Sequence, residues 1–250
     1  EDTARNTHTL GGGVSGVDFN RSGVPLLEIV TEPDISNADE AFAYLTALKR
    51  ILQYLEVSDC NMEEGSLRAE ANVSIRPKGA KEFGVKTEVK NVASFSGVHK
   101  AIDYEIARQR QILDEGGAIV QETRGWDADK GVTVSQRSKE SAHDYRYFPE
   151  PDLVPLAVDE AWEARIRESL PELPRARWQR FQDQYELSPY DAEVLTASRA
   201  MADYFEETVK AGAGAKPAAN WIMGDLQALL TKTGLGVEAC KVASAELAAM

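Results

Sequence analysis

The sequence predicts an α+β protein, with a first half built mainly on antiparallel strands and an all-α second half. Up to about residue 157, short stretches of alternating apolar and polar residues are separated by glycines and turn signals. Beyond that point, apolar residues recur at helical spacing. Residues 149–155 hold three prolines, which can continue neither a helix nor a central strand. We therefore predict two domains, residues 1–157 and residues 158–250.

Composition narrows the function classes. The chain has 250 residues, 43% of them hydrophobic, and a formal net charge of −13. That charge argues against a generic binder of nucleic-acid backbone, which needs a basic face. No apolar run approaches the roughly 20 residues of a membrane span, and the first residues do not form a signal peptide. The two cysteines, far apart, form neither a disulfide framework nor a zinc motif, so we expect a cytoplasmic protein.

The first elements expected are a strand and a helix. Residues 24–30 are almost continuously apolar and predict a buried strand, which Pro33-Asp34 ends. A helix should follow, capped near Ser36 or Asn37. Its predicted apolar stripe has helical spacing and consists of Ala41, Tyr44, Leu45, Leu48, Ile51, Leu52 and Leu55.

Two adjacent strands are expected next, over residues 67–75 and 85–91, joined by a turn at residues 77–80. Both stretches alternate strictly, which places polar and apolar side chains on opposite faces. The polar face carries Arg68, Glu70, Asn72, Ser74 and Arg76 from the first strand, and Lys86, Glu88 and Lys90 from the second.

The remaining elements follow from stop and start signals. A long helix should run from Ser94 to about Glu115, where Gly116-Gly117 stops it. A second hairpin should join residues 118–126 to residues 132–137. Four further helices are expected near residues 160–170, 174–186, 190–211 and 217–232, with Asp159 and Ser188 as N-caps and Pro174 and Pro189 in first turns.

The charged hairpin face is the strongest candidate for chemistry. It mixes the carboxylates of Glu70 and Glu88 with basic and neutral polar side chains. Carboxylate oxygens suit Mg²⁺, and arginine or lysine neutralises phosphate charge, so the face has the groups that phosphoryl transfer requires. A merely solvated face would show the same alternation, and that alternative stays open.

Two other polar stretches are weaker candidates. The segment of residues 137–149 is dense in ions and aromatics, and Arg137, Tyr145 and Arg146 could clamp a phosphate or a nucleotide. His143 could serve in acid–base chemistry, although a structural histidine fits equally well. The paired Glu63 and Glu64 could bind a metal, but solvent-facing loop residues are the simpler interpretation.

Several long motifs, in order along the chain, resemble the B-subunit family of tRNA-dependent amidotransferases. They are residues 17–34 (VDFNRSGVPLLEIVTEPD), 62–68 (MEEGSLR), 86–91 (KTEVKN), 121–124 (QETR), 143–152 (HDYRYFPEPD), 190–192 (YDA) and 220–224 (NWIMG). The similarity extends over essentially the whole chain.

This resemblance implies an enzyme that uses ATP and Mg²⁺ to phosphorylate the side-chain carboxylate of Glu-tRNA(Gln) or Asp-tRNA(Asn). Ammonia released from glutamine by the A subunit then displaces phosphate, and a small C subunit holds the other two together. The implied fold is a catalytic cradle domain with a glutamine-synthetase-like sheet, whose C-terminal part would be residues 1–157, followed by a helical linker domain at residues 158–250. The chain lacks the family's N-terminal Gly-Leu-Glu-x-His ligands and its tRNA-binding tail, so we expect it to be inactive alone.

The resemblance also assigns roles to single residues. The family's metal-binding acids correspond to Glu1, Glu70 and Glu88. The expected catalytic residues are Glu88, Glu70 and Lys86, and the expected phosphate contacts are Arg68, Lys90, Arg76 and Arg146. One departure is that Ala69-Glu70 replaces the family's usual Cys-Asp, which extends the carboxylate by one methylene.

Two other functions stay open. The chain could be a non-catalytic module that holds tRNA or partner subunits within the same complex. It could also be a paralogue that works with a different glutaminase, as in the archaeal Glu-tRNA-specific enzyme.

Overall fold

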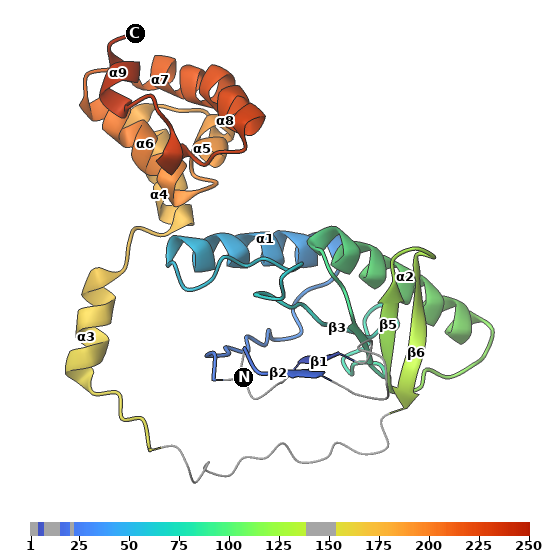
Figure 1. Ribbon diagram of the computed structural model, residues 1–250. Helices are drawn as coiled ribbons and strands as arrows, with labels where there is room; N and C mark the ends of the chain where they lie inside the picture. The colour runs from blue at the N-terminus through green and yellow to red at the C-terminus, as the bar shows by residue number, and fades with distance from the viewer. Residues whose placement is uncertain (1–4, 8–15, 21–22, 139–153) are drawn as a thin grey trace. The chain divides into compact units, whose positions relative to one another are not determined.

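The computed structural model describes residues 5–7, 16–20, 23–138 and 154–250, which fall into two compact units, residues 1–36 and residues 37–250 (Figure 1). The predicted motif around His143 and Arg146, and most of the proline-rich segment, lie outside the described residues. The first unit contains a short antiparallel pair, β1 (Arg5–Thr7) and β2 (Gly16–Asp18).

The predicted buried strand at residues 24–30 is wrong. This segment has no regular secondary structure, and Leu26 and Leu27 are 72% and 74% exposed. Apolar character alone does not make a strand, because the backbone needs a neighbouring strand to complete its hydrogen bonds. Among the residues described in this unit, only β1 and β2 pair as strands.

The second unit begins with α1 (Ala38–Tyr54) and contains a four-stranded sheet. Asn37 caps α1 by accepting a hydrogen bond from the backbone N–H of Glu40, as one of the two expected caps. The sheet order is β3 (Ala71–Val73), β4 (Thr87–Lys90), β5 (Glu122–Asp127) and β6 (Val132–Ser138). Both predicted hairpins are confirmed, although β3 is much shorter than expected.

The sheet is mixed, because β4 and β5 run parallel while the outer pairs are antiparallel. The predicted long helix, α2 (Phe95–Asp114), connects β4 to β5 and returns the chain to the same end of the sheet. Ser94 caps this helix, and Gly116 follows it in the left-handed conformation (φ +77°).

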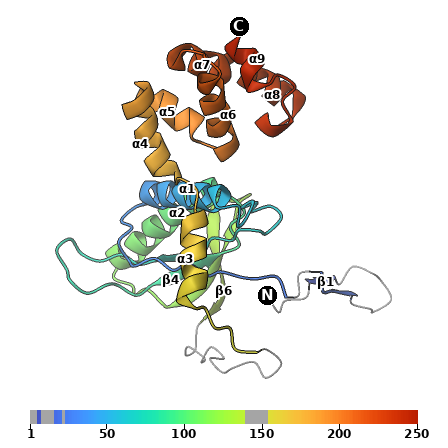
Figure 2. The same ribbon diagram turned by 90° about the vertical axis from the view of Figure 1, so that its left-hand side faces the viewer.

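Helices α1 and α2 pack on one face of the sheet (Figures 1 and 2). Val73, Val89, Ala101 and Ile102 are buried where sheet and helices meet. Thr87 and Val89 therefore face the helices, and the alternation of β4 turns Glu88 and Lys90 to the opposite face. The predicted division into an apolar and a charged face is confirmed for this strand.

Beyond residue 157 the described chain is helical. Its helices are α3 (Glu160–Ser169), α4 (Pro174–Tyr185), α5 (Pro189–Leu195), α6 (Arg199–Lys210), α7 (Ala215–Trp221), a π-helical turn (Ile222–Leu226), α8 (Gln227–Thr233), a 3₁₀ turn (Val237–Ala239) and α9 (Ser244–Ala248). The expected caps at Asp159 and Ser188 are present.

The single helix predicted near residues 190–211 is in fact two helices. At the end of α5, the hydroxyl of Thr196 donates a hydrogen bond to the carbonyl of Ala192, and Ser198 then caps α6. The core of this helical part includes Phe181, Leu195 and Phe205, all fully buried.

Candidate functional site

The candidate site lies on the sheet face opposite α1 and α2. The strand registers place Asn72, Glu88 and Thr123 side by side across β3, β4 and β5. Antiparallel pairing of β3 with β4 also brings Glu70, just before β3, beside Lys90 at the end of β4. Two candidate carboxylates from separate stretches of the chain thus meet on one face.

Lys90 joins these carboxylates. Its Nζ lies 2.8 Å from Oε2 of Glu70 and 3.6 Å from Oε1 of Glu88. Partial burial favours the neutral amine, but hydrogen bonding and charge interactions with Glu70 and Glu88 outweigh it and raise the pKa of Lys90 above its usual range. Lys90 is therefore a firmly protonated ammonium held between two carboxylates.

Thr123 holds the other oxygen of Glu88. Its hydroxyl donates a 2.8 Å hydrogen bond to Oε2 of Glu88. Thr123 is buried, and the side chain of Glu88 is only 15% exposed. The Glu88 carboxylate is consequently oriented from two sides, a feature that strand alternation alone did not predict.

Gly125 of β5 has no side chain, and Gln136 of β6 occupies the space that a side chain there would fill. A β-bulge in β6 shifts the register between Thr123 and Arg124, because Thr123 pairs with Arg137 and Arg124 pairs with Ser135. The intervening Gln136 lies over Gly125, where an added Cβ would clash with its Nε2. A side chain at residue 125 would therefore push Gln136 away from this face.

The other predicted site residues are less closely engaged. Arg68 and Lys86 are exposed. Arg76 donates to the carbonyl of Lys81 at 2.6 Å and stacks on the ring of Phe83, 4.5 Å from its centroid. Arg76 thus braces the turn between the strands, whereas Glu1 and Arg146 lie outside the described residues.

The groups on this face have the chemistry of ligands for a divalent cation. Among the described residues, no three histidine, cysteine, aspartate or glutamate side chains gather closely enough to hold a metal ion. Glu70 and Glu88 do converge, with the neutral oxygens of Asn72 and Thr123 in register beside Glu88. Oxygen donors of this kind fit a hard cation such as Mg²⁺, with these two carboxylates supplying some of its ligands.

An ion network lies behind the site, between α2 and the sheet. Glu105 is fully buried and accepts hydrogen bonds from Arg108 (2.6 and 2.9 Å), Gln109 (2.9 Å) and Thr133 (3.1 Å). Arg124 of β5 lies 3.8 Å from the same carboxylate. Burial acts to raise the pKa of Glu105, but these donors prevail and lower it. The network ties β5, and with it Thr123, to α2.

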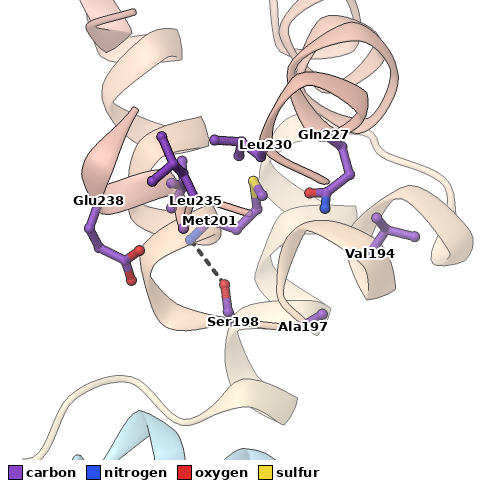
Figure 3. Close-up of a pocket in the computed structure, with 10 residues that line it drawn as sticks. Val194, Ala197, Ser198, Met201, Gln227, Leu230, Leu235 and Glu238 are labelled. Atoms are coloured by element: carbon purple, nitrogen blue, oxygen red, sulfur yellow. Dashed lines mark hydrogen bonds between the residues drawn. The ribbon is translucent and has the colours of Figure 1, made fainter. Parts of the chain in front are cut away.

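The helical part contains a pocket with a volume of about 630 Å³ (Figure 3). Its walls include Val194, Met201, Leu230 and Leu235, and the hydroxyl of Ser198 already accepts the backbone N–H of Met201 as a helix cap. These side chains offer no set of acids, bases or nucleophiles for a reaction. We therefore place the candidate chemistry on the sheet.

None of the helices in the described part of the chain has the length and apolarity to cross a bilayer. This agrees with the lack of a long apolar run in the sequence.

Comparison with known families identifies the class. The sequence model of the GatB/GatE catalytic domain matches residues 1–164, which include Glu70, Glu88 and Lys90. A second model, described as the GatB domain, matches residues 203–250.

Individual relatives agree. The chain is 56% identical over 234 residues to the B subunit of the aspartyl/glutamyl-tRNA(Asn/Gln) amidotransferase of Carboxydothermus hydrogenoformans, covering 94% of this chain and 49% of that protein. It is 53% identical over 250 residues to the B subunit of the same enzyme from Trichlorobacter lovleyi, covering 100% of this chain and 52% of that protein. The chain therefore belongs to the GatB family of amidotransferase B subunits, and it spans about half the length of the curated relatives it matches.

Proposed function

We propose that this chain forms part of an amidotransferase B subunit that activates the side-chain carboxylate of Glu-tRNA(Gln) or Asp-tRNA(Asn) with ATP and Mg²⁺. In this assignment residues 1–157 belong to the catalytic cradle domain and residues 158–250 to the helical linker domain. The partners would be a glutaminase A subunit, a C subunit and the mischarged tRNA, in the cytoplasm. The single observation that carries the proposal is the convergence of Glu70, Glu88 and Lys90 on one sheet face.

The reaction requires activation because a carboxylate is a poor electrophile. A carboxylate oxygen of the aminoacyl side chain attacks the γ-phosphorus of ATP, ADP leaves, and an acyl phosphate forms. Ammonia then attacks the acyl carbon, phosphate leaves with the bonding electrons, and the side-chain amide remains after ammonia loses a proton. The enzyme lowers the barrier of the first step mainly by neutralising charge and positioning the reactants, since both reactants are anionic.

The residues of the sheet face would divide this work. Glu88, oriented by Thr123, and Glu70 would hold Mg²⁺, which when bound neutralises phosphate charge and positions the transferred group. Lys86, just before β4, and Arg68, a few residues before β3, are exposed and would approach the phosphates from solvent. Arg76 would act mainly by keeping the connecting turn in place, because its guanidinium is already engaged there.

Replacing Glu88 by glutamine tests the proposal. Glutamine keeps the size of the side chain and an acceptor for Thr123 but removes the charge, so we expect ATP cleavage that depends on Glu-tRNA(Gln) to fall by about 100-fold. The measurement compares the wild-type and Glu88→Gln full-length subunits, each assembled with its partners. Glutaminase activity and tRNA binding are followed separately and should be retained.

Glu82→Gln provides the matched control, since Glu82 is an exposed acid in the loop leading to β4. It should leave tRNA-dependent ATP cleavage within about twofold of wild type, as surface substitutions away from special features usually do. Unchanged ATP cleavage in Glu88→Gln would instead mean that the charged face is solvated surface, as the scaffold alternative requires.

A further inference from the structure

We propose that Lys90 is a built-in counter-cation that competes with the divalent cation for Glu70 and Glu88, so that metal entry releases Lys90 from the carboxylates. This inference rests on the proposed function, because it concerns the same two carboxylates. It adds an exchange step: the ammonium that holds the face together before metal binds becomes available to the nucleotide phosphates afterwards.

The positions of the charges carry the argument. Lys90 contacts one oxygen of each carboxylate, at 2.8 Å for Glu70 and 3.6 Å for Glu88. These carboxylates are also the two candidate metal ligands that the sheet brings together. A cation bound to both would face the Lys90 ammonium across a few ångströms, where like charges repel appreciably even at high effective dielectric constant. The ammonium and a divalent cation are therefore expected to exclude one another.

Burial explains why a resident cation is needed. Glu88 is mostly shielded from water, and Glu70 is 45% exposed. Two carboxylates that lie close together repel each other, and a positive charge placed between them offsets that repulsion. Lys90 supplies that charge, and its side chain is 30% exposed, which gives the ammonium a path toward solvent.

The hydrogen bond from Thr123 keeps the Glu88 carboxylate in place while the cation bound to it changes. Thr123 is a neutral donor on the far oxygen of Glu88, so its hydrogen bond can persist whether lysine or metal neutralises the carboxylate. Lysine is suited to the moving part, because its ammonium is a compact charge on a flexible four-carbon stem. The carboxylate stays oriented while its cation changes.

The exchange predicts opposite effects on two ligands. Lys90→Gln should tighten Mn²⁺ binding in the absence of nucleotide by about tenfold, because the competing charge is removed. The same variant should raise the KM for ATP by about fivefold or more, because a phosphate contact is lost. Damage to the fold would weaken both interactions, so the opposite signs separate exchange from simple disruption.

The experiment titrates Mn²⁺ into the full-length subunit assembled in its complex and follows free Mn²⁺ by electron paramagnetic resonance. Wild type is compared with Lys90→Gln, Lys90→Arg, Glu88→Gln and the double variant Lys90→Gln/Glu88→Gln. Lys90→Arg keeps a positive charge beside the carboxylates, so it should not tighten Mn²⁺ binding as Lys90→Gln does. Lys78→Gln, which removes an exposed lysine from the turn after β3, should stay within about twofold of wild type.

The outcomes separate the two proposals. Tighter Mn²⁺ binding in Lys90→Gln that disappears in the Glu88→Gln background supports the exchange through Glu88. If Glu88→Gln weakens Mn²⁺ binding but Lys90→Gln leaves it unchanged or weakens it, the exchange is wrong and the metal site stands. If neither variant alters Mn²⁺ binding, or wild type binds none, the metal site fails and the exchange fails with it.

Discussion

Replacing Glu105 by alanine is expected to lower the free energy of unfolding by about 3–5 kcal/mol, the cost of breaking a buried ion pair by removing one partner. Arg108 and Arg124 would lose a fully buried carboxylate and be left with Glu122, which lies 3.8 Å from Arg108 and 2.6 Å from Arg124. Denaturant unfolding followed by tryptophan fluorescence measures the loss.

Glu115→Ala is the matched control, because Glu115 is an exposed acid at the end of the same helix. It should change the free energy of unfolding by no more than about 0.5 kcal/mol. A Glu105→Ala loss as small as the control's would show that water replaces the carboxylate, and that the network does not hold β5 against α2.

Glu206 should make the helical part sensitive to acid. Burial tends to raise the pKa of its carboxyl, but hydrogen bonds from Arg180, Arg177 and Tyr185 outweigh burial and lower the pKa from 4.5 to about 2. A depressed pKa in the folded state adds stability above the unfolded-state value, and that contribution is lost as pH falls from about 4.5 toward 2. At pH 7 its size is about 3 kcal/mol.

The test compares wild type with Glu206→Gln by denaturant unfolding at several pH values. The difference in free energy of unfolding should be about 3 kcal/mol at neutral pH and should shrink below about pH 4. Glu207→Gln is the control, since Glu207 is the exposed neighbour on α6 and should differ little from wild type at any pH. If the difference in free energy of unfolding between wild type and Glu206→Gln does not change with pH, the loss comes from altered packing and not from the lost charge.

The sequence predicted the helix N-termini well, because an N-cap depends on one side chain and the residues next to it. Asn37, Ser94, Asp159 and Ser188 each cap the helix that their residue type and position indicated. The break between α5 and α6 was missed, because Ser198 begins a new helix within an apolar pattern that continues across it. Helical spacing reports which face is apolar and does not by itself reveal a one-turn interruption.

Strand pairing was predicted only between strands that follow one another in the chain without a helix between them. The hairpin pattern correctly placed Glu88 and Lys90 on the polar face of β4. The parallel pairing of β4 with β5 depends on how α2 crosses the sheet, so Thr123 could not be placed beside Glu88 from alternation. The strand expected at residues 24–30 failed for a related reason, because a strand exists only with a partner.

The sequence does hold a signal of the ion network behind the sheet. Glu105 and Gln109 lie on the buried side of α2 together with Ala101 and Ile102. A charged residue at a position that helical spacing assigns to the core requires a buried partner. Arg108 is a local partner three residues along the same helix, whereas Arg124 becomes evident only when the sheet is placed against the helix.

We propose that Glu70 and Glu88 form a divalent-cation and phosphate site. The most direct test is the anomalous scattering of Mn²⁺ in crystals of the full-length assembled complex, grown with a non-hydrolysable ATP analogue. We predict an Mn²⁺ peak in contact with the carboxylates of Glu88 and Glu70, with Lys90 turned from them toward the phosphates. If nucleotide and metal bind elsewhere and Lys90 stays between the two carboxylates, this sheet face is not the metal and phosphate site.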